Sequence, residues 1–161
     1  MKTTQLKKVL IALDYNPVAL KVVEAGFSLA KAMEAEIILT HVITDPIYYS
    51  TLEYSPIMGF SNNQEITPIQ LESFEGLKKA AQHFLDKTKH HLENEIIQTV
   101  VGEGNIAESI LKTAKDWHVD VIVLGTHSQK WLENIIVGSV AKDILNHSQI
   151  PLFIVPTKKR R

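Results

Sequence analysis

Five apolar runs recur along the chain, and a longer stretch of mixed polar and apolar residues separates each run from the next. The runs are continuous or nearly so, which is typical of strands buried on both faces of a parallel sheet. Strands are therefore predicted over residues 8–14 (KVLIALD), 36–42 (EIILTHV), 96–101 (IIQTVV), 121–124 (VIVL) and 152–155 (LFIV).

The stretch after the first strand has apolar residues at helical spacing. Asn16 and Pro17 predict where this helix starts, with Asn16 as the N-cap and Pro17 as the first helical residue. One stripe of the helix is expected to pack on the sheet. The stripe consists of Val18, Val22, Ala25, Leu29 and Met33.

Three further helices are predicted along the chain. The one that starts after Asn105 has a capping box, because Glu108 follows at the third position. The other two run from after Thr67-Pro68 to about residue 91, and from Gly138 to about residue 146. Residues 43–67 break the pattern with prolines, tyrosines and a Ser-Asn-Asn sequence, so a long loop that is functional or mobile is expected there.

The resulting alternation of strand and helix predicts an α/β fold. It is expected to be a single-domain, open, five-stranded parallel sheet with helices on both faces and right-handed crossovers. The domain is predicted to span residues 1–157, and the last four residues, 158–161 (KKRR), form a basic tail. A chain of 161 residues is long enough to bury one sizeable core.

Charge and composition exclude several classes of function. The 17 Lys and Arg residues nearly balance the 18 Asp and Glu residues, so a dedicated nucleic-acid binder is not expected. The chain has no cysteine, which excludes disulfides, thiolate metal sites and thiol nucleophiles. No apolar segment reaches the ~18 residues of a membrane span, so no membrane partner and a cytoplasmic location are expected.

A ligand site is expected where the winding of the sheet reverses. If the first strand is central, this point lies beyond the carboxyl ends of strands one and four. These strands end at Asp14 and Gly125. A carboxylate and a glycine-containing loop are thus predicted to meet at one crevice.

Gly138 and Ser139 open the last predicted helix. A helix N-terminus offers backbone N–H groups and a positive dipole end, both suited to a phosphate. A preceding glycine lets a ligand approach the backbone closely, and Ser139 could add a hydroxyl donor. Alternatively, Ser139 is an N-cap and Gly125 a turn residue. The residue pattern by itself leaves both interpretations open.

Residues 102–107 (GEGNIA) match the dinucleotide fingerprint G-x-G-x-x-G/A. The motif follows the third strand rather than the first, and Asp120, the acid at the expected distance, begins a strand instead of ending one. We therefore interpret the segment as a capped strand-to-helix turn. No P-loop sequence occurs in the chain.

The seven histidines do not form a pattern typical of a metal site. His90 and His91 point in different directions on a helix and are expected on the surface. His41, near the end of the second strand, is interpreted as a core or edge histidine with its hydrogen bonds satisfied. His127 lies in the glycine loop, where it could face a phosphate or water. No base–nucleophile pair is visible, so at most weak ATPase or autophosphorylating activity is expected.

Four segments together resemble the universal stress protein family over essentially the whole chain. They are VLIALD, IILTHV, GNIAESILKTAKDWHVDVIVLGTH and GSVAKDILNHSQIPLFIVP. The ATP-binding branch of this family carries G-x2-G-x9-G-[ST] after the fourth strand. Here the spacing is intact, with Gly125, Gly138 and Ser139 in place and Ser128 where that branch has glycine. Ala12 also departs from the branch, which often has proline there.

The resemblance implies a dimeric sensor or regulator of the stress response that binds ATP or AMP, with or without Mg2+. It implies a homodimer formed through the last strand, Leu152 to Val155, and little or no turnover. The residues that it places around the nucleotide are Ala12, Leu13, Asp14, Val42, Leu124, Gly125, Thr126, His127, Ser128, Gly138, Ser139 and Val140. The alternative is a dimeric protein-interaction module of the branch that does not bind nucleotide.

Overall fold

The computed structural model describes residues 5–14, 18–44, 74–126 and 138–157, and it forms one five-stranded parallel sheet. The strands lie in the order β3-β2-β1-β4-β5. Their bounds are β1 Lys8–Ala12, β2 Glu36–Ile43, β3 Gln98–Glu103, β4 Val121–Gly125 and β5 Leu152–Val155. The helices are α1 Ala19–Ala32, α3 Phe74–His91, α4 Ile106–Asp116 and α5 Ser139–His147.

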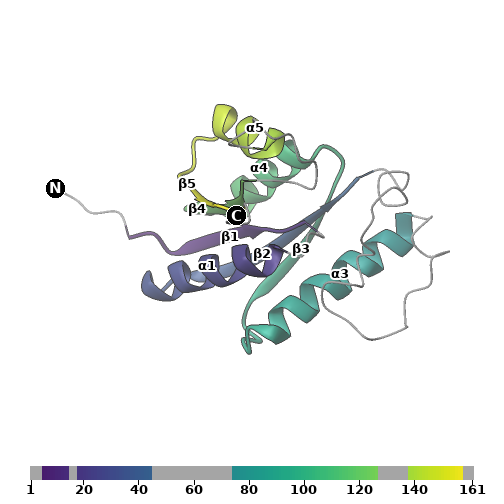
Figure 1. Cartoon of the computed structure of the whole chain (residues 1–161), viewed down its shortest axis with the longest axis horizontal. Coiled ribbons are helices and arrows are strands. Elements are labelled where there is room, and N and C mark those ends of the chain that lie inside the picture. The colour runs from purple at the N-terminus through teal and green to yellow at the C-terminus, as the bar shows by residue number, and fades with distance from the viewer. Residues whose placement is uncertain (1–4, 15–17, 45–73, 127–137, 158–161) are drawn as a thin grey trace, which may run out of the picture.

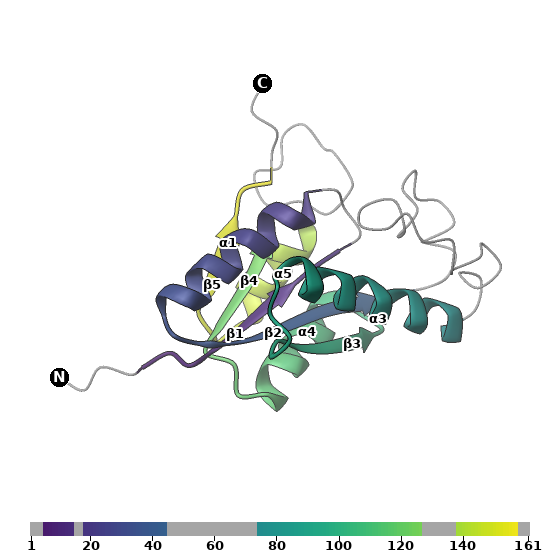
Figure 2. The same cartoon turned by 90° about the horizontal axis from the view of Figure 1, so that it is seen from below.

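Helices cover both faces of the sheet (Figure 1). Helices α1 and α3 lie on one face, in front of the sheet in Figure 2, and α4 and α5 lie on the other. Two apolar clusters result, because successive residues of a strand point to opposite faces. Ile11 of β1 belongs to the cluster under α1 and α3, and its neighbour Leu10 belongs to the cluster under α4 and α5. The predicted α/β class is confirmed.

Strand β1 is central, as its unbroken apolar run predicts. Ile11 is in register with Leu39 of β2 on one side and with Val123 of β4 on the other. The chain winds outward from β1 through β2 to β3, and then crosses back to β4 and β5. The winding therefore reverses between β1 and β4, which confirms the predicted position of the switch point.

Helix α1 differs from its prediction in its start, and its buried face is wider than the predicted stripe. It begins at Ala19 with Val18 at the N-cap position, whereas Asn16 and Pro17 lie outside the described residues. The stripe packs on the core as predicted at Val22, Ala25, Leu29 and Met33, of which only Val22 is fully buried. The other buried residues of the helix are Ala19, Val23, Gly26 and Ala30, and Gly26 faces Ile11 and Val123 at close range.

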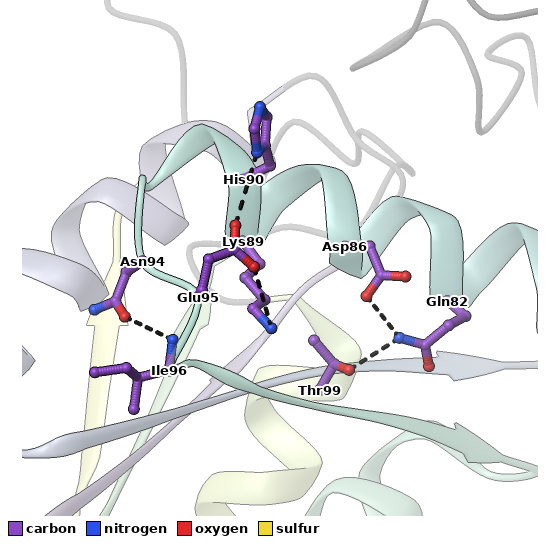
Figure 3. Close-up of polar contacts among 8 residues, drawn as sticks. All are labelled: Gln82, Asp86, Lys89, His90, Asn94, Glu95, Ile96 and Thr99. Carbon is purple, nitrogen blue, oxygen red and sulfur yellow. Dashed lines mark hydrogen bonds and ion pairs between the residues drawn. The ribbon is translucent and has the colours of Figure 1, made fainter.

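Strand β3 begins two residues later than predicted. Its first residue, Gln98, pairs with Ile38, and this register places the strand opposite the end of β2. Ile96 is 87% exposed and lies in the turn after α3 (Figure 3). The Asn94 carboxamide oxygen accepts a hydrogen bond from the Ile96 N–H at 3.1 Å and so fixes the turn. The predicted start at Ile96 is wrong, because this apolar side chain is exposed in the turn and does not enter the sheet.

The remaining boundaries follow the predictions closely. Strand β1 ends at Ala12, two residues earlier than predicted, although the Leu13 N–H still donates to the Thr40 carbonyl at 2.9 Å. Residues 68–73, with which the predicted helix was expected to begin, lie outside the described residues, as do most of the predicted 43–67 loop and the basic tail. In the part of the chain that the structure describes, no helix is long and apolar enough to cross a membrane.

Candidate functional site

The carboxyl ends of β1, β2 and β4 and the N-terminus of α5 form the candidate site. At the end of β1, Leu13 is buried and Asp14 is half-buried. Just before Asp14, the Leu13 N–H donates to the Thr40 carbonyl and so keeps the chain paired with β2 one residue beyond β1. It places Asp14 at the reversal of the winding, where open α/β sheets bind their ligands.

His41 fixes the backbone behind Asp14. Its ring is buried, its Nδ1 lies 2.7 Å from the Leu13 carbonyl oxygen, and it packs edge-on against Phe84 of α3. Since a carbonyl only accepts, Nδ1 carries the proton and donates. Burial lowers the pKa of His41 to about 4, and the hydrogen bond to Leu13 opposes this shift only in part. His41 is thus a neutral core histidine with a satisfied Nδ1, as interpreted from the sequence.

Thr126 connects the end of β4 to two other elements. Its N–H donates to the carbonyl of Val155 in β5 at 3.0 Å, and its own carbonyl accepts from the N–H of Gly138. The first residue after β4 and the residue that caps α5 are therefore directly bonded. This contact brings the two ends of the glycine motif together.

Gly125 is required by packing. A Cβ on Gly125 would lie 2.8 Å from Cγ2 of Thr157 and 3.0 Å from Cγ2 of Val22. Both distances are shorter than normal van der Waals contact, so a side chain would displace the tail after β5 or helix α1. The side-chain position of Gly125 thus faces protein, and it is the backbone that borders the crevice.

Gly138, and not Ser139, occupies the N-cap position of α5. Its φ of −62° and ψ of 159° are extended, and Ser139 is the first helical residue. The alternative that Ser139 is an N-cap is therefore wrong. The N–H groups of Ser139, Val140 and Ala141 belong to the first turn, which has no carbonyl partners within the helix. The bond from Gly138 to Thr126 places this first turn at the carboxyl edge of the sheet, and Ser139 is exposed there.

Ten of the twelve residues expected around a nucleotide lie at this edge. Leu13, Val42 and Leu124 are buried, so only their backbones could meet a ligand. The others are Ala12, Asp14, Gly125, Thr126, Gly138, Ser139 and Val140, whereas His127 and Ser128 lie outside the described residues. Thr157, which contacts both Gly125 and Thr126, was missed because nothing distinguishes a threonine in the Pro-Thr-Lys end of the chain.

The dinucleotide-like segment forms a capped turn, as interpreted. Gly104 has a φ of +92°, and the Asn105 carboxamide accepts from the Glu108 N–H at 3.0 Å. The segment begins in the last two residues of β3, an edge strand away from the switch point. Asp120 lies at the opposite end of the sheet, where its Oδ2 accepts from the backbone N–H groups of Lys7 and Lys8. Asp120 is therefore not placed to bind a ribose beside these glycines.

Gly102 lets α4 pack closely against β3, and this can be tested by substitution. Gly102→Ala is expected to lower the free energy of unfolding by about 1–2 kcal/mol, since its Cβ would overlap the Ser109 hydroxyl and lie 3.2 Å from Cγ2 of Val42. Ser109→Ala in the same chain removes the overlapping atom and should recover most of the loss. Urea denaturation measures both effects, and an equal loss in the double variant contradicts the assignment.

The described histidines other than His41 are not arranged as metal ligands. His90 is exposed and its Nδ1 lies 3.8 Å from Glu95, which also contacts Lys89 at 3.6 Å (Figure 3). His91 faces Glu24 at 3.8 Å. Within the described ranges, no three His, Asp or Glu side chains are placed to hold a metal ion.

Fold and site together define a doubly wound α/β protein with its crevice between β1 and β4. Residues 5–156 match the sequence profile of the Universal stress protein family, and the chain belongs to that family. Universal stress protein MJ0577 of Methanocaldococcus jannaschii is 30% identical over 158 residues, covering 94% of this chain and 96% of the relative. Universal stress protein A of Salmonella typhi is 25% identical over 152 residues, covering 94% and 95%.

Solved structures share the fold. That of MJ0577 superposes with a TM-score of 0.69 at 25% identity and covers 98% of this chain and 100% of its own. UspA of Lactobacillus plantarum has a TM-score of 0.67 at 18% identity, covering 95% and 99%. A universal stress protein in complex with cAMP has a TM-score of 0.62 at 16% identity, covering 96% and 100%.

Proposed function

We propose that this universal stress protein binds an adenine nucleotide, ATP or AMP, in the crevice between β1 and β4. The observation that carries the proposal is the position of the α5 N-terminus. The bond from Gly138 N–H to the Thr126 carbonyl holds the first turn of α5 against the end of β4, at the switch point. N–H groups of a first helical turn at the carboxyl edge of a parallel sheet suit a phosphate chain.

The phosphates are proposed to lie on the first turn of α5. Gly138 and the backbones of Ser139 and Val140 would contact them there, and the exposed Ser139 hydroxyl adds a donor. His127 and Ser128, between the two glycines in sequence, complete the proposed contacts. Mg2+ would accompany the phosphates if ATP is the ligand.

The adenosine is proposed to lie beyond β1, next to Val42. Backbone groups of successive strand residues point to opposite sides. The Thr40 carbonyl accepts from Leu13 on the β1 side, whereas the Ile43 carbonyl accepts from Gly104 on the β3 side. The N–H and carbonyl of Val42 therefore point to the β1 side, at a level beyond Ala12, the last residue of β1. That backbone could read the edge of an adenine ring, with Ala12, Leu13 and Asp14 near the ribose.

The biological role is proposed to be that of a dimeric sensor or regulator that binds nucleotide with little turnover. Strand β5 is an edge of the sheet, and Phe153 on it is 40% exposed. An exposed apolar edge strand favours pairing with a second copy, so Leu152–Val155 is the proposed dimer contact.

Calorimetric titration with ATP, AMP and cAMP, with and without Mg2+, tests the proposal. Ser139→Glu is expected to weaken nucleotide binding roughly tenfold or more, because its carboxylate would face the phosphates. The fold should not suffer, since an acidic residue in a first helical turn is stabilising. Ser139→Gln has the same size without the charge and should bind more tightly than Ser139→Glu.

Gly138→Val provides a second arm of the same experiment. The φ and ψ of Gly138 are accessible to any residue, so valine fits the backbone, and its side chain is expected to lie where the phosphates are proposed to bind. Nucleotide binding should be lost while the melting temperature of the free protein is kept. The proposal is contradicted if the wild type shows neither heat of binding nor thermal stabilisation at millimolar ATP, AMP and cAMP.

A further inference from the structure

Thr157 lies behind the candidate site, just after β5, and is 6% exposed. Its N–H donates to the Thr126 hydroxyl oxygen at 3.1 Å, and the two hydroxyl oxygens lie 3.2 Å apart. Its methyl group fills the space that the missing side chain of Gly125 leaves open. One buried side chain thus contacts both residues at the end of β4.

Thr126 transmits this contact to α5. The hydroxyl of Thr126 is held by Thr157, its N–H by the Val155 carbonyl, and its carbonyl accepts from Gly138 N–H. With its hydroxyl and N–H both held by the chain around β5, the direction of the Thr126 carbonyl is set. That direction determines where the first turn of α5 begins.

We infer that Thr157 is a positioning residue that holds the two ends of the glycine motif in place for the phosphates. Its backbone N–H and its hydroxyl both contact the Thr126 hydroxyl, and Thr126 in turn orients Gly138 and the α5 N–H groups. The inference rests on the proposed function, since it concerns the same nucleotide site. It adds a residue beyond the end of β5 that does not itself touch the ligand.

Two variants separate the hydroxyl from the methyl group. Thr157→Val keeps the shape that packs on Gly125 and the backbone N–H bond to the Thr126 hydroxyl, and it loses only the contact between the two hydroxyls. Loss of that contact is expected to lower nucleotide affinity roughly threefold to tenfold. Thr157→Ser keeps the hydroxyl and loses the methyl, so its affinity should stay within about twofold of the wild type although its melting temperature falls. A merely structural Thr157 would lower the melting temperature without this split in affinity.

Thr88→Val is the matched control. Thr88 is fully buried, and its hydroxyl donates to the Phe84 carbonyl at 2.8 Å within α3. Removing this hydroxyl takes away a similar buried hydrogen bond on another element. It should lower stability and leave nucleotide affinity unchanged.

Amide hydrogen exchange at Gly138 gives a readout that needs no ligand. Thr157→Val should speed this exchange, since the acceptor Thr126 carbonyl is then less well held, whereas Thr88→Val should not. The inference is overturned if Thr157→Val binds nucleotide as tightly as the wild type, or if Thr157→Ser loses affinity. It is also overturned if amide exchange at Gly138 is unchanged in Thr157→Val. If the wild type binds no nucleotide, the proposed function fails, and exchange at Gly138 alone decides whether Thr157 positions α5.

Discussion

Replacing Gly26 by valine is expected to lower the free energy of unfolding by about 3 kcal/mol. A Cβ at Gly26 would lie 2.7 Å from Cδ1 and 2.9 Å from Cγ1 of Ile11, and 3.1 Å from Cγ1 of Val123. Both neighbours are fully buried on the central strands, so neither can move without disturbing the core. Urea denaturation of the variant and the wild type measures the difference.

Ser28→Val is the control for this prediction. Ser28 is exposed on the same helix, so valine there brings the restricted rotamers of a β-branched residue without the contact. Little loss of stability is expected. If the Gly26→Val protein is as stable as the Ser28→Val protein, the packing of α1 does not depend on the close approach of Gly26 to β1 and β4.

A double-mutant cycle locates the contact. Gly26→Ala adds only the Cβ, and Ile11→Val removes Cδ1, the nearest atom to it. The two substitutions together should destabilise the protein by less than the sum of their separate effects. If the two effects are additive, the contact with Ile11 is not the cause of the destabilisation at Gly26.

Acid is expected to destabilise the protein through His41, by on the order of 3 kcal/mol between pH 7 and pH 4. The pKa of His41 is lowered from 6.5 to about 4 in the folded chain. Between these values the unfolded chain binds a proton at His41 that the folded chain does not. The contribution of neutral His41 to the free energy of unfolding is therefore complete above pH 6.5, and it is lost as the pH falls toward 4.

His41→Asn removes the titration and keeps a donor for the Leu13 carbonyl, because the Asn amide nitrogen resembles Nδ1. Its free energy of unfolding, measured in urea from pH 7 to pH 4, should depend less steeply on pH than that of the wild type. His118→Asn is the matched control, since His118 is exposed with a φ of 54°, a conformation that Asn tolerates. An acid dependence in His41→Asn as steep as in His118→Asn refutes the assignment.

The architecture was predictable because it depends on patterns that the chain carries locally. Continuous apolar runs identify buried strands, and the run at Val9, Leu10 and Ile11 correctly indicated the central one. The Asn105 cap was predictable for the same reason, since a capping box involves residues only three positions apart.

The errors arise where distant parts of the chain decide the outcome. The close packing of Gly26 on two strands was not predicted, because a glycine carries no apolar signal in a periodicity pattern. The start of β3 is set by its register with β2, so the apolar Ile96 was wrongly placed in the strand. Thr157 was missed because its importance comes from contacts 31 positions away in the chain.

For the site, the sequence predicted which elements meet but not what each residue does there. The position of Asp14 and Gly125 at the switch point follows from strand order. That Gly125 is needed for packing on Thr157 and Val22, and that Gly138 caps α5, depends on atomic contacts and dihedral angles. A glycine motif in the sequence does not distinguish a glycine that accommodates a neighbour from one that accommodates a ligand.

The central place of β1 also has a consequence for how the chain is made. The Lys8 N–H binds Asp120, which is 112 positions later, and β1 then pairs with β4. On the ribosome, β1 can pair with β2 early, but its other edge has no partner until β4 emerges. A nascent chain thus exposes an apolar strand edge through most of its synthesis, and folding must be slow relative to a protein with local contacts. Protection of the nascent chain is therefore most needed between the emergence of β2 and that of β4.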